Sequence, residues 1–398
     1  MTTLSRRTLL TGTVVALASA APAAAIAVPR EAGASTVIEW SQALLRIVRT
    51  PGVQPPTVHP TRSFAMVHAA MYRAATLSPS TALVAAVAQA GHDVLVVLYP
   101  SAAPDLDAVL QAQLATAHDT ARGIRIGRTA ARRMIELRAA DGSTATPPAI
   151  PPGTEPGQYR PTPPAFNPPV FTHWSAVTPF VLDRADQFRP APYPDLTGTR
   201  YADAINEVAD IGRDTSATRT AEQTVQARFW PGPIQNYWNE IAQSVLRTTG
   251  LMKATRVFAQ LNLTFADAAI AFYDAKYHYR VWRPVTAIRM ADTGGNPATT
   301  ADPTWSSLLT SSAPSYPGGH SVVGQAGATV LAACTGQRHR LVVTSEVLPG
   351  VVRTFDRLQD AADEAGIARF LGGVHTRLDH EAGQRPGAHV ARAVLART

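Results

Sequence analysis

The sequence has one cysteine, Cys334, and only two lysines, Lys253 and Lys276, among its 398 residues. A single cysteine excludes an intramolecular disulfide and any zinc site built from a cysteine cluster. Cys334 lies in an apolar run, which indicates a core position. Because nearly every other positive charge is an arginine, a lysine inside a candidate site would be unusual for this chain.

Charged residues are also few, at 16% of the chain, and aromatic residues are modest in number, at 7%. This composition excludes a disordered protein, which would need fewer apolar residues and more charge. The formal net charge is +7, but the basic residues are scattered rather than gathered in runs. Their distribution weighs against a nucleic-acid partner and is equally compatible with a small anionic ligand. The length allows one large or two medium domains.

Long apolar runs are missing except at the N-terminus. Arg6 and Arg7 precede an apolar stretch that is rich in Ala, Gly and Thr and reaches about residue 25, followed by an A-x-A pattern. We interpret residues 1–27 as a twin-arginine signal peptide, so the mature protein is expected to be secreted or extracytoplasmic. No other window approaches about 18 uncharged apolar residues, so no membrane contact is expected after the signal is removed.

Apolar residues recur at three- and four-residue spacing through most of the remaining chain. The pattern predicts helices over 36–49, 60–77, 81–99, 104–119, 121–140, 199–212, 219–228, 233–249, 254–279 and 320–335. We therefore predict an all-α protein of two packed helical bundles, residues 28–142 and 196–398, with the candidate site in the second.

Residues 143–195 separate the two predicted bundles and contain fourteen prolines, too many for a helix or an interior strand. Aromatic residues are interleaved with the prolines, which argues against a free linker. We interpret the segment as an ordered strap wrapped over the helices, with a ligand-lining lid as the alternative.

The first candidate site segment ends the longest predicted helix. Lys276 and Arg283 are seven residues apart, so they would share one helix face if the helix continued as far as Pro284. Two cations on a helix are usually a solvated stripe. Here the intervening aromatic residues suggest burial, and a buried pair of cations would need an anion.

The second segment, residues 314–321, is a proline-glycine turn that opens onto the apolar helix 320–335. Backbone N–H groups of Gly319 and His320 at a helix N-terminus form an anion site, and the His320 side chain could exchange protons at its edge. The alternative is a glycine-rich turn with a capping serine.

The third segment, residues 368–379, contains Arg369, a Gly372-Gly373 pair, His375 and Asp379. Spacing of one helical turn would let Asp379 accept a proton from one nitrogen of His375 and leave the other as a ligand or nucleophile. The alternative is an ordinary amphipathic helix with a surface His/Asp pair.

Taken together, the ordered triplet K-x6-R-P, P-x-G-H and R-x5-H-x3-D resembles the superfamily shared by vanadium-dependent haloperoxidases and type-2 phosphatidic-acid-phosphatase-like acid phosphatases. The haloperoxidase branch fits better. The runs R-F-L-G-G-V-H-x-R-x-D and K-x5-W-R-P are similar to that branch, as are V-H-A-A-M-Y, F-W-P-G-P and the proline-rich strap.

The resemblance implies an exported enzyme that uses vanadate to oxidise halide with hydrogen peroxide, with phosphate as a competitor of the cofactor and an organic molecule as a further acceptor. His375 would bind vanadium, and His320 would act as the acid–base residue. The remaining implied cofactor-binding residues are Lys276, which is also catalytic, Arg283, Gly318, Gly319, Arg369 and Asp379. The oligomeric state stays open, with a homodimer as one option.

Two positions depart from the family pattern. Gly318 stands where serine is common, and Ala313 stands where chloroperoxidases tend to have phenylalanine and bromoperoxidases histidine. Both departures bear on halogenating efficiency and halide choice. The strongest competing hypothesis is an exported acid phosphatase that uses the same pocket, with His375 as nucleophile and His320 as general acid. The sequence is also compatible with a non-halogenating relative and with a non-catalytic protein that binds an oxyanion.

Overall fold

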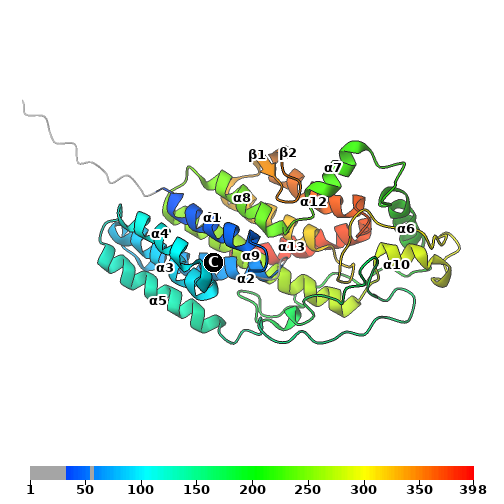
Figure 1. Cartoon of the computed structure of the whole chain (residues 1–398), viewed down its shortest axis with the longest axis horizontal. Coiled ribbons are helices and arrows are strands. Elements are labelled where there is room, and N and C mark those ends of the chain that lie inside the picture. Colours follow the sequence, from blue (N-terminus) through cyan, green and yellow to red (C-terminus); the bar gives the residue numbers. More distant parts are fainter. Residues whose placement is uncertain (1–32, 54–57) are drawn as a thin grey trace, which may run out of the picture. The chain divides into compact units, whose positions relative to one another are not determined.

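Residues 33–53 and 58–398 are described by the structure, a computed structural model (Figure 1). The predicted signal peptide, residues 1–27, lies outside the described residues. The described residues form one compact unit by their contacts.

The first half of the described chain is helical, as predicted, with bounds that differ by a few residues. The helices are α1 (Ser35–Arg49), α2 (His59–Leu77), α3 (Leu83–Leu98), α4 (Ala103–Leu114) and α5 (Thr120–Arg138), with short 3₁₀ turns η1 (Ser80–Ala82) and η2 (Pro100–Ala102). Helix α3 packs against α2 and α5, and its run of buried alanines lets these neighbours approach closely.

The apolar composition of α3 has a further consequence. Together with η1, the segment Ser80–Leu98 is long and apolar enough to cross a membrane by length and composition, and 61% of its most apolar window is buried within the protein. Burial between α2 and α5 accounts for this composition, because a helix that is enclosed on most sides has apolar residues on nearly all of its faces.

The second half holds the remaining helices. They are α6 (Thr199–Ile211), α7 (Ala221–Phe229), α8 (Ile234–Leu246), α9 (Leu251–Tyr279), α10 (Pro284–Arg289), α11 (Gly319–Thr335), α12 (Leu358–Leu371) and α13 (Arg377–Arg397), with the 3₁₀ turn η4 (Ala291–Thr293). The all-α prediction is confirmed, because the described residues contain only two short strands besides these helices.

Those strands, β1 (Arg338–Thr344) and β2 (Val352–Arg357), form an antiparallel hairpin that the apolar spacing did not predict. Leu341 pairs with Phe355 across the hairpin. The loop between the strands contains Gly350 at φ 85°, a left-handed conformation that favours glycine.

Helix α9 is the central element, since it packs against α2, α11 and α13 (Figure 1). Every residue from 257 to 273 is buried, so this helix is enclosed on all sides. One hydrophobic cluster contains side chains of α1 to α5 together with α7, α8, α9, α11, α12 and α13, whereas α6 and α10 belong to a second cluster. A common core therefore joins the two predicted bundles, whose boundaries stay a prediction.

Two glycines of α13 bring its first half against α11. A Cβ at Gly387 would lie 2.2 Å from the carbonyl oxygen of Val322, and one at Gly383 would lie 2.8 Å from that of Gly318. Any larger residue would push the helices apart. Glycine at these positions therefore sets the distance between the N-terminal ends of α11 and α13, where the candidate site lies.

The proline-rich strap contains no α-helix, only the 3₁₀ turn η3 (Trp174–Ala176), and hydrogen bonds to other elements hold it in place. The buried carboxylate of Asp267 in α9 accepts the backbone N–H groups of Phe180 at 2.6 Å and of Val181 and Leu182 at 2.8 Å. The amide of Val170 donates to the carbonyl of Ser312 at 3.0 Å. The strap is thus fixed to the central helix and to the segment that borders the site.

Candidate active site

The C-terminal end of α9 presents Lys276, but the helix does not continue to Arg283. It ends at Tyr279, because Arg280 adopts a left-handed conformation with φ 50°. Arg283 is the N-cap residue of α10, with Pro284 as the first helical residue. The expectation that both cations share one helix face is therefore wrong, although the turn brings them to the same site.

Lys276 is buried, with 4% of its surface exposed. Its Nζ donates to the carbonyl oxygens of Pro314 at 2.6 Å and Ser315 at 2.9 Å. Burial lowers the pKa of Lys276 well below its usual value, and repulsion from Arg283 lowers it further. A nearby anion would reverse both effects, since it favours the charged form.

Arg283 is equally buried and fixed by several acceptors. Its Nε donates to Ala313 O at 2.6 Å, Nη1 to Val374 O at 2.5 Å, and Nη2 to Ser311 Oγ at 2.7 Å. Ala313, one of the two departures from the family pattern, therefore orients this guanidinium through its backbone. Nη1 also lies 3.3 Å from Nε2 of His375.

Arg369, in the last turn of α12, supplies the third cation and is 8% exposed. Its Nε and Nη1 are buried and have no hydrogen-bond partner in the described part of the chain. Burial lowers the pKa of Arg369 to about 10, with repulsion from Arg283 as a further cause. Buried guanidinium donors without acceptors are costly, so this side chain is arranged for a ligand that supplies acceptors.

The N-terminus of α11 lies beside these cations. Gly318 is the N-cap residue, with φ −70°, and its N–H donates to Asp379 O at 2.8 Å. The backbone amide of Gly318 already donates this hydrogen bond, so it is not available to a ligand. Gly319 and His320 occupy the first helical turn, where backbone N–H groups have no acceptor within the helix, and these are the donors that face an anion.

The His320 imidazole is held by the F-W-P-G-P turn. Its Nε2 lies 2.9 Å from Trp230 O and 3.3 Å from Gly232 O. Carbonyl oxygens can only accept, so Nε2 carries the proton and Nδ1 of the neutral ring is the proton acceptor. Burial lowers the pKa of His320 to about 3, and repulsion from Arg369 contributes.

His375 does not lie within a helix, contrary to the expected helical turn between it and Asp379. Helix α12 ends at Leu371, and Gly373 turns the chain with φ 73°. Thr376 then starts α13 through a capping box with Asp379, whose side chain accepts the Thr376 N–H at 2.6 Å. The sequence T-x-x-D carries this capping signal, and it could have placed the helix start correctly.

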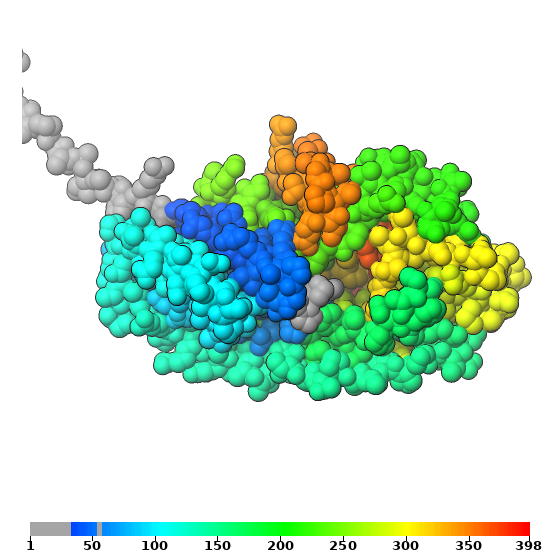
Figure 2. All heavy atoms as spheres, viewed as in Figure 1, coloured from blue at the N-terminus to red at the C-terminus, as the bar shows by residue number. Residues whose placement is uncertain are grey.

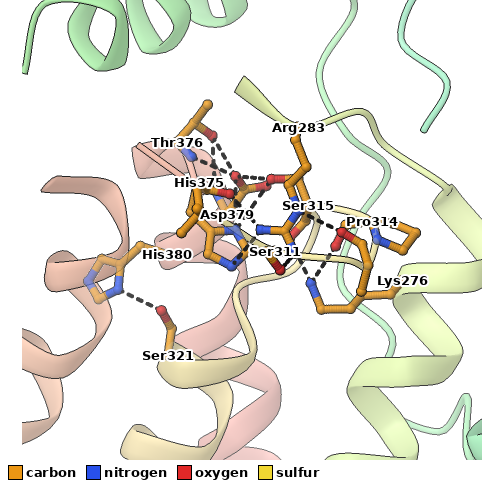
Figure 3. A network of polar contacts seen from close by, with 12 residues as sticks. Lys276, Arg283, Ser311, Pro314, Ser315, Ser321, His375, Thr376, Asp379 and His380 are labelled. Atoms are coloured by element: carbon orange, nitrogen blue, oxygen red, sulfur yellow. Dashed lines mark hydrogen bonds and ion pairs between the residues drawn. The ribbon is translucent and has the colours of Figure 1, made fainter. Parts of the chain in front are cut away.

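The two ring nitrogens of His375 have different partners (Figure 3). Nε2 faces the Arg283 guanidinium, which can only donate, so this nitrogen carries a lone pair. The proton is therefore on Nδ1, which lies 3.4 Å from Asp379 Oδ2 and 3.3 Å from Ser315 Oγ. This arrangement leaves Nε2 able to bind a metal or attack an electrophile.

Ser315 is a site residue that the motifs did not single out. Its hydroxyl donates to Asp379 Oδ2 at 2.8 Å and lies between that carboxylate and His375 (Figure 3). Although burial alone would raise the pKa of Asp379, its hydrogen bonds with His375, Thr376 and Ser315 lower it. The carboxylate therefore stays ionised and orients the imidazole.

One cavity of about 430 Å³ collects most of the candidate residues. Its polar wall consists of Lys276, Arg283, Gly319, His320, Arg369 and His375. Gly318 and Asp379 are not on the cavity wall and support it from behind. Figure 2 shows the hollow between the N-terminal helices in blue and the β1–β2 hairpin in orange, with yellow and red segments deep inside.

Three buried cations, first-turn amides and a histidine lone pair surround one cavity of this helical protein, an arrangement that could hold an oxyanion. No salt bridge joins Lys276, Arg283 or Arg369 to a carboxylate among the residues that the structure describes. The donors without acceptors on Arg369 fit an oxyanion such as vanadate or phosphate.

The C-terminal part of the chain is similar to a known family. Residues 256–398 match the family model described as the VCPO second helical-bundle domain, and this range includes every candidate site residue. The search of curated proteins finds no match.

Among solved structures, the chain is similar to a bacterial vanadium-dependent iodoperoxidase, with 25% identity, a TM-score of 0.78, and 93% of this chain and 98% of that one covered. It is also similar to an apo-type bacterial vanadium-dependent chloroperoxidase, with 16% identity, a TM-score of 0.72, and 87% and 94% covered. A holo-type chloroperoxidase matches at 18% identity with a TM-score of 0.63, and 91% and 92% are covered. The chain has the vanadium haloperoxidase fold, and the family resemblance predicted from its motifs is confirmed.

Proposed function

We propose that the protein is a vanadate-dependent haloperoxidase that oxidises halide with hydrogen peroxide to hypohalous acid. The observation that carries the proposal is the unpaired Arg369 guanidinium beside two other buried cations in one cavity. In a structural ion-pair network, carboxylates would neutralise these positive charges. In a site for an oxyanion, the ligand neutralises them instead.

The proposed role of each residue follows from its position in the cavity. Lys276, Arg283 and Arg369 would neutralise the oxygens of vanadate, and the amide of Gly319 would donate a hydrogen bond. Nε2 of His375 would bind vanadium, with its proton held on Nδ1 by Asp379. When bound, vanadate supplies the Lewis acidity that activates hydrogen peroxide for attack by halide.

His320 handles the proton. Its Nε2–H is anchored to the carbonyls of Trp230 and Gly232, so Nδ1 is the basic atom of the ring. We assign Nδ1 as the acceptor of the proton that hydrogen peroxide loses on entering the site. Burial lowers the pKa of His320 and repulsion from Arg369 lowers it further, and a bound oxyanion would raise it.

The proposal extends to the setting of the enzyme. We infer export through the twin-arginine pathway and an extracytoplasmic location from Arg6, Arg7 and the apolar run that follows. Phosphate would compete with vanadate for the cavity, because both are tetrahedral oxyanions.

The test is reconstitution with orthovanadate in phosphate-free buffer, followed by vanadium analysis and by assays of iodide and bromide oxidation with hydrogen peroxide. We expect one vanadium per chain and peroxide-dependent halide oxidation. His375→Ala should lose vanadium, whereas His320→Ala should keep it and lose turnover. Equal vanadium loss in both variants would contradict this division of roles.

An acid phosphatase is supported by the same geometry, because the lone pair on His375 Nε2 could also attack a phosphate ester. Turnover of 4-nitrophenyl phosphate that vanadate inhibits, without halide oxidation, would favour the phosphatase. Vanadate binding with neither activity would favour an oxyanion-binding protein.

A further inference from the structure

The position of the His320 ring depends on a short turn between two helices. The carbonyl oxygens of Trp230 and Gly232 accept its Nε2–H, at 2.9 and 3.3 Å. Both residues lie between α7, which ends at Phe229, and α8, which begins at Ile234. Whatever fixes this turn therefore also fixes the proton and the orientation of the imidazole.

One buried hydroxyl contacts both ends of the turn. Tyr237, near the start of α8, donates its O–H to the Phe229 carbonyl at 2.7 Å. The same oxygen lies against Gly232, where a Cβ would be only 2.8 Å from it. Burial raises the pKa of Tyr237 to about 12, so the hydroxyl keeps its proton and remains a donor. Tyr237 is 1% exposed and is not on the cavity wall, so it would not touch a ligand there.

Two further elements hold the same turn. Ser345 directly follows β1, and its Oγ donates to the Phe229 carbonyl at 2.6 Å and lies 3.1 Å from the Tyr237 hydroxyl. The Phe229 oxygen thus accepts two hydroxyl donors, which uses both of its lone pairs. The indole N–H of Trp230 donates to Glu364 of α12 at 3.0 Å. The turn is therefore anchored to α8, to the hairpin and to α12.

These contacts bear on the proton of His320. A neutral imidazole carries its proton on either ring nitrogen, and the hydrogen bonds around it decide which one. Two carbonyls at Nε2 favour the Nε2–H form, which leaves the Nδ1 lone pair to accept a proton. If the turn shifted, the Nδ1–H form would gain population, and that form cannot accept a proton at Nδ1. A contact that only packed the core would not change this balance.

We propose that Tyr237 is a positioning residue for His320. Its hydroxyl holds the turn from Phe229 to Gly232, and two carbonyls of that turn keep the His320 proton on Nε2. The catalytic consequence rests on the proposed function, in which Nδ1 of His320 accepts a proton from hydrogen peroxide. The effect on the ring itself belongs to the folded chain and requires no bound vanadate.

The proton position is measured by nitrogen-15 NMR of histidine-labelled protein without vanadate at neutral pH. The ring signals of His320 are those that His320→Ala lacks. Tyr237→Phe removes the hydroxyl and keeps the ring. The matched control is Tyr99→Phe, which removes a buried hydroxyl that bonds to Ser63 at 2.8 Å.

We expect the ratio of the Nε2–H to the Nδ1–H form of His320 to fall about fivefold or more in Tyr237→Phe, equivalent to about 1 kcal/mol. In Tyr99→Phe the ratio should change less than about twofold. Ser345→Ala removes the other donor to the Phe229 carbonyl and should lower the ratio in the same direction, so the proposal is decided even if Tyr237→Phe does not fold. An unchanged ratio in the folded variants of this turn, or an equal fall in the control, would overturn the proposal.

Kinetics of the vanadate-loaded protein test the catalytic consequence. In Tyr237→Phe, kcat for iodide oxidation should fall at least in proportion to the share of the Nε2–H form. Vanadium content and KM for hydrogen peroxide should change less than about twofold. A kcat that stays unchanged while that share falls would contradict the role of Tyr237 in catalysis.

Failure of the proposed function would give a different result. A natural protein that binds vanadate but forms no triiodide from iodide and hydrogen peroxide would contradict halide oxidation. The ratio of the two His320 forms, measured without vanadate, would still confirm or overturn the role of Tyr237.

Discussion

Replacing Gly318 with serine tests how the departure from the family pattern affects cofactor binding. The backbone permits a side chain, because φ is −70° rather than positive. The difficulty is space, since a Cβ there would lie 3.1 Å from Asp379 O and 3.2 Å from Ser321 Oγ. Both neighbours must move by a few tenths of an ångström, and Asp379 also orients His375.

The magnitude follows from two opposing terms. A serine hydroxyl that turns from Asp379 O and Ser321 Oγ, which its Cβ would face, toward a charged oxygen in the cavity would gain about 1.5–3 kcal/mol, and crowding at the start of a packed helix costs about 1 kcal/mol. The net gain of about 0.5–2 kcal/mol predicts vanadate affinity roughly 2- to 30-fold tighter in Gly318→Ser than in the natural protein. Bromide oxidation should rise with it.

The assay is a vanadate titration in phosphate-free buffer, with Gly318→Ala as the matched control. Alanine adds the Cβ without the hydroxyl, so it should bind vanadate about fivefold more weakly than the natural protein, which corresponds to the crowding of about 1 kcal/mol. The difference between serine and alanine then measures the new hydrogen bond. A folded serine variant that binds vanadate no more tightly than the alanine variant would refute the reasoning.

Three further changes test the supporting structure. Lys276→Arg should lower kcat/KM for halide at least about tenfold, which is a loss of about 1.4 kcal/mol of transition-state stabilisation. A planar guanidinium cannot reproduce the two carbonyl contacts of a compact ammonium, and steady-state kinetics measure the effect. Ser315→Ala should weaken vanadate binding about tenfold, because Asp379 loses a hydroxyl donor and orients the vanadium-binding imidazole less firmly; an unchanged titration would contradict this. Asp267→Ala should lower the free energy of unfolding by about 3 kcal/mol or more, since three strap amides lose their acceptor, with Asp267→Asn intermediate; thermal unfolding measures both.

Most of the helices were predictable because apolar residues repeat with helical spacing, and α9 matches the longest predicted helix. Helices α10, α12 and α13 were not among those predicted, although α12 carries Arg369 and α13 carries Asp379. The β1–β2 hairpin was not predicted, although Pro349 and Gly350 mark its turn. Strands this short are easily missed, because only Leu341 and Val343 are buried in β1. Alternation over so few residues is a weak signal.

At the site, residue identities were easier to predict than the path of the backbone. Lys276 and Arg283 do meet, but through a turn at Arg280 whose left-handed conformation leaves no mark in the sequence. Ser315 could not be found from spacing, because its partner Asp379 is 64 residues away. Contacts of this kind depend on the packing of α11 against α13, which only the folded chain reveals.

The same packing explains why the site needs a ligand. Lys276, Arg283 and Arg369 are each less than 10% exposed, and burial lowers the pKa of all three. Repulsion from Arg283 lowers the pKa values of Lys276 and Arg369 further. The carboxylate that lies near these cations in the described part of the chain, Asp379, already bonds to His375, Ser315 and the start of α13. Folding therefore leaves uncompensated positive charge in the cavity. If the site binds an oxyanion as we propose, that ligand at one hundred times its Kd would stabilise the folded protein by about 2.7 kcal/mol through mass action, so removing one of the three cations should lower both the affinity and this ligand-dependent gain in stability.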